Sequence, residues 1–308
     1  MFTWIEWLNG VFVVFRLLLQ HRVFLVIGSL NYTLALVIRL CGIIGIDLPI
    51  EGKYVMSPRH HTINANGIDQ SVYEWDGSGT PILFVHATGF HARVWDAVID
   101  LLPGVHAYAL DLRGHGLTEK PAPPYAWKTV GVDVAAAAEA LGLRGALGVG
   151  HSMGGHSLTY AQAHHPDLFA RLLLIDPVIL PEFAYVGALE GEHFASKRRA
   201  DWSSPDEMIA KFETRAPFNR WNPRVLRDYV NFGLLPRADG GYTLACPPAV
   251  EGAIYMQSSG GNIYPEIAGI TIPVTILRAK GSWNIDVTDF TSSPTAPDLA
   301  SRFQHAED

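Results

Sequence analysis

A serine lies between two glycines in the stretch Gly150-His151-Ser152-Met153-Gly154, directly after the apolar run 145–149. In a tight turn from a buried strand into a helix, such a serine takes a strained backbone conformation, and the glycines beside it leave out side chains that would clash there. Residues 156–164 are interpreted as the helix that follows the turn. The motif alone also occurs by chance, so its interpretation depends on the sequence around it.

Several apolar runs around this motif are predicted to form buried strands. They cover residues 81–86, 106–111, 145–149 and 171–176. An alanine-rich stretch at about 130–141 is predicted to be a helix between the second and third runs. Strands that are apolar throughout and alternate with helices indicate an α/β fold, with a mostly parallel sheet covered by helices on both faces. In such a sheet, reactive groups are expected at the carboxyl ends of the strands.

Four motifs occur in order along the chain and together resemble the α/β-hydrolase family. They are His-Ala-Thr-Gly-Phe at 86–90, Asp-Leu-Arg-Gly-His-Gly at 111–116, Gly-His-Ser-Met-Gly-Gly at 150–155 and Asp-Pro at 176–177. The resemblance covers residues 57 to about 300 and implies the α/β-hydrolase fold. Ala87 departs from the family pattern, which usually has a glycine there and therefore more backbone freedom.

The resemblance also implies a mechanism. Ser152 would be the nucleophile that forms an acyl-enzyme, and the backbone amides of Met153 and Thr88 would bind the oxyanion. A serine nucleophile argues against haloalkane dehalogenases and epoxide hydrolases, which form an ester on a carboxylate. We expect structural roles for four polar residues in or beside these motifs: His86, Arg113, His115 and His151.

The remaining members of the expected catalytic triad are harder to assign. The resemblance implies an acid after the last predicted strand, 272–278, where Asp286 is the first carboxylate and the favoured acid. Asp289 and Asp176 are alternatives, and each of the three is also a plausible turn residue. The family order places the basic histidine beyond one more strand. His305 is the only histidine after Asp286, and we interpret its segment as the end of a helix before that strand. The sequence is therefore interpreted as truncated before the C-terminal strand, the catalytic histidine and the final helix.

The segment 177–270 is longer than the core sheet needs and is predicted to form a helical cap. Helices are expected at 206–215 and 223–232, and an extended or looping segment at 246–248. Because aromatic residues are dense in this segment, we expect a small-molecule substrate with an apolar acyl or aromatic group. The hydrolase core would then comprise residues 56–176 and 271–308.

Residues 1–55 form a compositionally distinct N-terminal segment, predicted to be helical. Residues 1–50 are mostly apolar, yet the uncharged stretch 23–38 has 16 residues, slightly short of the ~17–25 that cross a bilayer. Three interpretations remain open: a membrane anchor or interfacial hairpin, helices that pack on the hydrolase or a partner, and an extension that does not belong to the mature protein. The third rests on Met56, which begins a stretch that resembles a natural start.

Charge and cysteine content narrow the classes of function. The formal net charge of −7 and the lack of basic runs argue against nucleic-acid binding. Two cysteines, Cys41 and Cys246, offer no disulfide framework and favour a cytoplasmic protein, with membrane association through residues 1–50 as the alternative. No metal site and no cofactor is predicted. The leading prediction is a serine hydrolase of a carboxylic ester or related acyl substrate. A lactone or carbon–carbon bond hydrolase and a non-catalytic binding relative are the alternatives.

Overall fold

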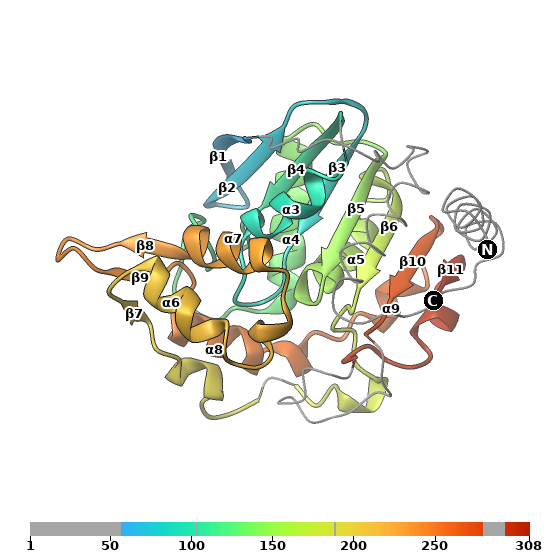
Figure 1. Ribbon diagram of the computed structural model, residues 1–308. Helices are drawn as coiled ribbons and strands as arrows, with labels where there is room; N and C mark the ends of the chain where they lie inside the picture. Colours follow the sequence, from blue (N-terminus) through green and yellow to red (C-terminus); the bar gives the residue numbers. More distant parts are fainter. Residues whose placement is uncertain (1–56, 103, 188, 280–292) are drawn as a thin grey trace, which may run out of the picture.

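The computed structural model describes residues 57–102, 104–187, 189–279 and 293–308 (Figure 1). The predicted N-terminal segment, Asp286 and Asp289 lie outside the described residues, so their interpretations stay predictions. Within the described ranges, each helix is too short or too polar to cross a lipid bilayer.

The core is an eight-stranded sheet in the order β1-β2-β4-β3-β5-β6-β10-β11. β2 is antiparallel to both β1 and β4, and all neighbours from β4 to β11 are parallel. This sheet confirms the predicted mostly parallel α/β fold. The strands are β1 Arg59–Ala65, β2 Ile68–Trp75, β3 Ser78–Val85, β4 Val105–Leu110, β5 Ala146–His151, β6 Phe169–Ile175, β10 Val274–Leu277 and β11 Ala306–Glu307.

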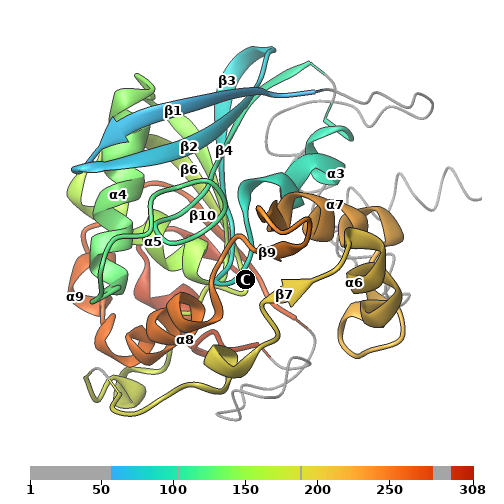
Figure 2. The same cartoon turned by 90° about the vertical axis from the view of Figure 1, so that its left-hand side faces the viewer.

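Helices cover both faces of the sheet, as predicted (Figure 2). α4 (Trp127–Ala140) and α5 (Met153–His164) lie on one face, and α3 (Asp96–Ile99) lies on the other. The short helix α9 (Tyr264–Ile267) packs beside α5. Short 3₁₀ helices lie at Ala92–Trp95, Glu182–Ala184, Phe194–Lys197, Phe218–Arg220, Ser258–Gly260 and Leu299–Arg302.

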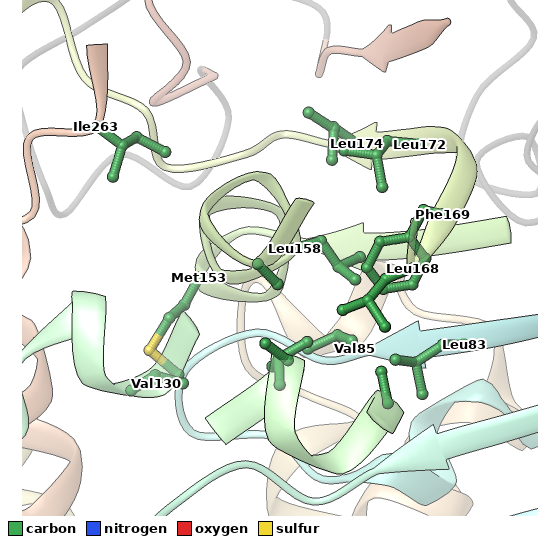
Figure 3. Close-up of a cluster of buried hydrophobic side chains, with 14 of the residues drawn as sticks. Leu83, Val85, Val130, Met153, Leu158, Leu168, Phe169, Leu172, Leu174 and Ile263 are labelled. Atoms are coloured by element: carbon green, nitrogen blue, oxygen red, sulfur yellow. The ribbon is translucent and has the colours of Figure 1, made fainter. Parts of the chain in front are cut away.

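The two-sided cover explains why the central strands are apolar at every position. In β3, Leu83 and Val85 belong to the buried cluster that includes residues of α4 and α5 (Figure 3). Ile82 and Phe84 alternate with them and belong to the cluster on the α3 face. All four side chains are fully buried. Because successive side chains of a strand point to opposite faces, each face of β3 needs its own apolar residues.

Within the segment 177–270, residues between Trp202 and Leu244 form a separate apolar cluster over the loop that follows β3, whereas several isoleucines of the segment pack into the core cluster. Arg224 Nη2 donates to Asp100 Oδ2 at 2.5 Å, and His91 Nε2 donates to the carbonyl of Tyr229 at 3.0 Å. These bonds dock the segment on residues 91–100 of the core. Its elements are α6 Pro205–Phe212, α7 Pro223–Gly233, α8 Pro248–Met256 and a three-stranded sheet of β7 Asp201–Trp202, β9 Tyr242–Leu244 and β8 Leu234–Pro236.

Two parts of the structure go beyond the sequence interpretation. Cys246 and Pro247 lie outside helices and strands, as expected for an extended or looping segment, but Pro248 is already the first residue of α8. Proline suits the first turn of a helix because that turn leaves amide groups unbonded anyway. The first strand was expected at 81–86, yet β1 and β2 precede it. β1 has no apolar run because most of its side chains, including His60 and His61, are partly or fully exposed.

The C-terminal residues also differ from the prediction. The segment around His305 was interpreted as the end of a helix before a missing strand. Instead Ala306 and Glu307 form β11, which pairs parallel with β10 in the register Val274↔Ala306. His305 directly precedes β11 and lies outside the helices and strands of the structure.

Candidate active site

Ser152 lies at the turn from β5 into α5, where the sequence predicted it. It has φ 56° and ψ −117°, a conformation that is strained for a residue with a side chain. Backbone hydrogen bonds hold this conformation. The amide of Ser152 donates to the carbonyl of Ile175 at 2.9 Å, and its carbonyl accepts from Gly155 at 3.0 Å and from Val178 at 3.2 Å. The turn is thus tied to its own helix, to the neighbouring strand and to the start of the segment 177–270.

The glycines on either side of Ser152 are required by close backbone contacts. A methyl group on Gly150 would lie 2.6 Å from the carbonyl oxygen of Gly154. A methyl group on Gly154 would overlap the carbonyl of Val85 at the end of β3. The spacing of the glycines therefore lets α5 begin directly against two strands, which brings its N-terminus to the carboxyl edge of the sheet.

Two backbone amides near Ser152 make no hydrogen bond in the described part of the chain. In the loop after β3, the amide of Gly89 donates to His115 Nε2 at 2.9 Å, and the amide of Phe90 donates to the carbonyl of Ala87 at 3.1 Å. Among the described residues, the amides of Thr88 and Met153 have no acceptor. Thr88 Oγ1 lies 3.5 Å from Met153 Sδ, so these two residues are in contact. Met153 is also the first residue of α5, where the helix dipole favours negative charge.

Of the three candidate acids, Asp176 lies among the described residues. It follows β6 at the same edge of the sheet as Ser152, with φ 40°. Its Oδ1 accepts a hydrogen bond of 2.7 Å from the amide of Ala279, just beyond β10. Burial lowers the pKa of His151, and the nearby carboxylate of Asp176 opposes that shift. The strand order thus brings Asp176 close to the residue that precedes Ser152.

His305 lies near the amino-terminal ends of the parallel strands, whereas Ser152 lies near their carboxyl ends. Its carbonyl accepts from the amide of Val274 at 2.9 Å, at the start of β10. Through the parallel register, Val274 is level with Leu172 of β6, whereas Ser152 follows His151, which is level with Ile175. The register therefore separates His305 from the serine along the strands as well as across them.

His86 and His115 are fully buried and hold loops together. His86 Nε2 accepts from the amide of Leu112 at 3.0 Å, and its Nδ1 donates to the carbonyl of Ala87 at 2.7 Å. Burial lowers the pKa of each imidazole to about 3, so both are neutral near pH 7. These contacts are those of structural residues, the role expected for both from the sequence.

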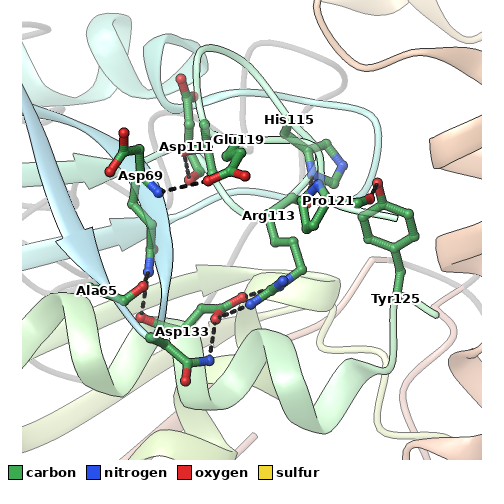
Figure 4. Close-up of polar contacts among 12 residues, drawn as sticks. Ala65, Asp69, Asp111, Arg113, His115, Glu119, Pro121, Tyr125 and Asp133 are labelled. Carbon is green, nitrogen blue, oxygen red and sulfur yellow. Dashed lines mark hydrogen bonds and ion pairs between the residues drawn. The ribbon is translucent and has the colours of Figure 1, made fainter. Parts of the chain in front are cut away.

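Arg113 has a buried partner that the sequence did not reveal. Its Nε and Nη2 donate to the two carboxylate oxygens of Asp133 at 2.6 and 2.7 Å (Figure 4). Asp133 is fully buried in α4 and also accepts from Asn66 Nδ2 at 2.7 Å. The partners are 20 residues apart, so no local pattern could pair them.

An aromatic group links the site to the segment 177–270. The ring of Phe90 lies 5.9 Å from that of His151, 5.5 Å from that of Trp221 and 5.4 Å from that of Tyr229. A small cavity beside Phe90 has room for about one water molecule and is also lined by Arg198 and other residues. Aromatic rings therefore line the side of the site toward α7, with the guanidinium of Arg198 beside them.

Together the fold and this geometry define an α/β protein with a serine at a strand-to-helix turn on the carboxyl edge of a parallel sheet. A profile described as "Alpha/beta hydrolase family" matches residues 82–306, and the chain belongs to this family. The position of the serine, the order of the strands and the family profile thus indicate the same family as the four sequence motifs.

Curated relatives and solved structures are similar over most of the chain. Lipase LipV from Mycobacterium tuberculosis is 29% identical over 228 residues, 71% of this chain and 82% of the lipase. 2-(Acetamidomethylene)succinate hydrolase from Mesorhizobium japonicum is 28% identical over 211 residues, 67% of this chain and 72% of that enzyme. A crystal structure of E-2-(acetamidomethylene)succinate hydrolase has a TM-score of 0.59 and 24% identity, covering 75% of this chain and 84% of that one. An esterase structure from Mycobacterium tuberculosis has a TM-score of 0.58 and 23% identity, covering 89% and 88%. The names of these relatives support a hydrolase activity.

Proposed function

We propose that this protein is a serine hydrolase that cleaves a carboxylic ester or a related acyl substrate through an acyl-enzyme on Ser152. The observation that carries the proposal is the combination of a strained serine with two unbonded amides, those of Met153 and Thr88, that belong to touching residues. The lipase and esterase names among the relatives support the same class of reaction.

In the proposed reaction, Ser152 Oγ attacks the carbonyl carbon of the substrate and gives up its proton to a general base. The carbonyl oxygen becomes an oxyanion, which accepts hydrogen bonds from the amides of Met153 and Thr88. When this intermediate collapses, the alcohol takes a proton and leaves, and the acyl group stays on Ser152. Water then cleaves the acyl-enzyme. We propose that Asp286 is the acid that orients this base, with Asp289 and Asp176 as alternatives.

One observation favours a second candidate, a non-catalytic relative that binds a ligand in the same place. In the described part of the chain, Ser152 Oγ makes no hydrogen bond to a histidine, and His305 lies toward the other edge of the sheet. A serine without a base keeps only a small fraction of hydrolase activity.

Labelling with a fluorophosphonate probe separates the two candidates. The probe forms a covalent bond with an activated serine, so a hydrolase is expected to carry one label on the peptide that contains Ser152, located by mass spectrometry. The same protein should hydrolyse p-nitrophenyl acetate. An unlabelled, folded protein that does not turn over this ester contradicts the hydrolase and supports the binding relative.

Trp221 is expected to influence which acyl groups the site accepts. Trp221→Ala removes the indole ring that lies beside Phe90, and with it an aromatic surface that an aromatic acyl group could contact. We therefore expect kcat/KM for p-nitrophenyl benzoate to fall about tenfold, while that for the acetate, which has no ring to make this contact, changes less. Phe194→Ala is the matched control, because this aromatic side chain of the same segment is 48% exposed. Equal losses for both esters in Trp221→Ala would contradict a role in substrate choice.

A further inference from the structure

The loop that carries Thr88 is tied to the segment 111–116 by side chains. Asp111 Oδ1 accepts from the amide of Ala92 at 2.7 Å, beyond one end of the loop. His86, at its other end, accepts from the amide of Leu112 at 3.0 Å. Between them, His115 Nε2 accepts from the amide of Gly89 at 2.9 Å. Gly89 directly follows Thr88, so this third bond is the one nearest to the proposed oxyanion donor.

His115 can accept this bond in one tautomer only. Its Nδ1 lies 2.9 Å from the carbonyl of Arg113 and donates to it, which leaves the lone pair of Nε2 facing the amide of Gly89. The ring is fully buried and lies 5.0 Å from that of His86. Because burial holds the pKa of His115 at about 3, the ring stays an acceptor at neutral pH.

A buried side chain of the segment 177–270 lies against the other side of Gly89. Gly89 has φ 78°, and a methyl group there would lie 2.6 Å from Glu251 Oε1. Glu251 is buried in α8 and accepts from Arg198 Nη1 at 2.5 Å. Gly89 is therefore held between the core and the segment 177–270, with His115 supplying its only hydrogen-bond acceptor in the described part of the chain.

We infer that His115 is a positioning residue, whose bond to the amide of Gly89 fixes the amide of Thr88 for the oxyanion. The inference rests on the proposed function. The nitrogens of Thr88 and Gly89 are separated only by the Cα and carbonyl carbon of Thr88, so a shift of Gly89 moves the Thr88 amide as well. Displacement of a catalytic group by ~1 Å can cost on the order of 10²-fold in rate. The effect belongs to the transition state, so it should act on kcat and leave KM nearly unchanged.

His115→Leu and His115→Gln test the inference. Leucine removes the acceptor and keeps an apolar volume, whereas glutamine can present an amide oxygen near the position of Nε2. We expect kcat for p-nitrophenyl acetate to fall about 10- to 100-fold in the leucine variant, with KM within about twofold, and glutamine to restore most of the loss. Rates are normalised to the fraction labelled by fluorophosphonate.

His156→Leu is the matched control. His156 is also fully buried, and its Nε2 bonds the carbonyl of Gly261 at 2.6 Å, away from the loop. Its loss should lower stability and leave kcat of the folded enzyme unchanged. If both leucine variants lower only stability, His115 has no positioning role.

Hydrogen–deuterium exchange tests the tether without requiring activity. The amide of Gly89 should exchange at least about tenfold faster in His115→Leu than in the wild type or in His156→Leu. Unchanged exchange overturns the inference. A wild-type protein without esterase activity, but with faster Gly89 exchange in the leucine variant, would contradict the proposed function and keep the tether.

Discussion

Ser152→Ala is expected to lower kcat for p-nitrophenyl acetate by about 10³-fold or more, down to the rate of the uncatalysed background. The variant lacks the atom that would form the acyl-enzyme, and the two unbonded amides beside it cannot replace a nucleophile. Alanine keeps the Cβ atom, so the turn between β5 and α5 should fold as before. The measurement is the initial rate of p-nitrophenolate release, with circular dichroism to compare the folds.

Ser301→Ala is the control for this experiment. Ser301 is an exposed serine whose hydroxyl donates to the carbonyl of Asp298, far along the chain from the site. Its replacement should leave the rate unchanged. An undiminished rate in Ser152→Ala would show that another group, or a contaminating esterase, hydrolyses the ester, and the assignment of the nucleophile would be wrong.

Asp133→Ala is expected to destabilise the fold by about 3–5 kcal/mol, because it leaves the guanidinium of Arg113 in a buried place without its carboxylate. Asn66 loses an acceptor at the same time. The free energy of unfolding is measured by urea denaturation. The surface pair Lys197–Glu192 provides the comparison, since its side chains are 73% and 59% exposed and Glu192→Ala should leave the free energy of unfolding nearly unchanged.

A double replacement separates the ion pair from general packing. Arg113→Met combined with Asp133→Leu removes both charges, so the pair should lose less stability than the sum of the two single variants. If Asp133→Ala costs less than about 1 kcal/mol, the pair does not hold the turn after β1, the loop 111–116 and α4 together as the contacts indicate.

The sheet could be predicted where both of its faces are covered. Ile82 to Val85 gave a recognisable apolar run because alternate residues face different helices. β1 could not be recognised in the same way, since its side chains are largely exposed. α8 was missed for a different reason: Pro247 and Pro248 are typical of loops as well as of helix starts, and packing decided between them.

The candidate site could also be predicted only where its residues belong to local sequence motifs. Spacing within a motif pointed to Ser152 and Met153, and the order of motifs pointed to Thr88. The tether from His115 to Gly89 spans 26 residues and depends on β3 and β4 lying side by side. Local sequence carries no signal for such a bond. The same holds for the nearness of Asp176 to His151, which the pairing of β5 with β6 creates.

The two buried imidazoles of His86 and His115 have a practical consequence for chemical modification. Both rings are fully buried, and both nitrogens of each ring are engaged in hydrogen bonds. Diethyl pyrocarbonate acylates an accessible, unbonded imidazole nitrogen, so the folded protein should protect this pair from the reagent. Inactivation of the native enzyme by diethyl pyrocarbonate would therefore identify a reactive histidine elsewhere in the protein.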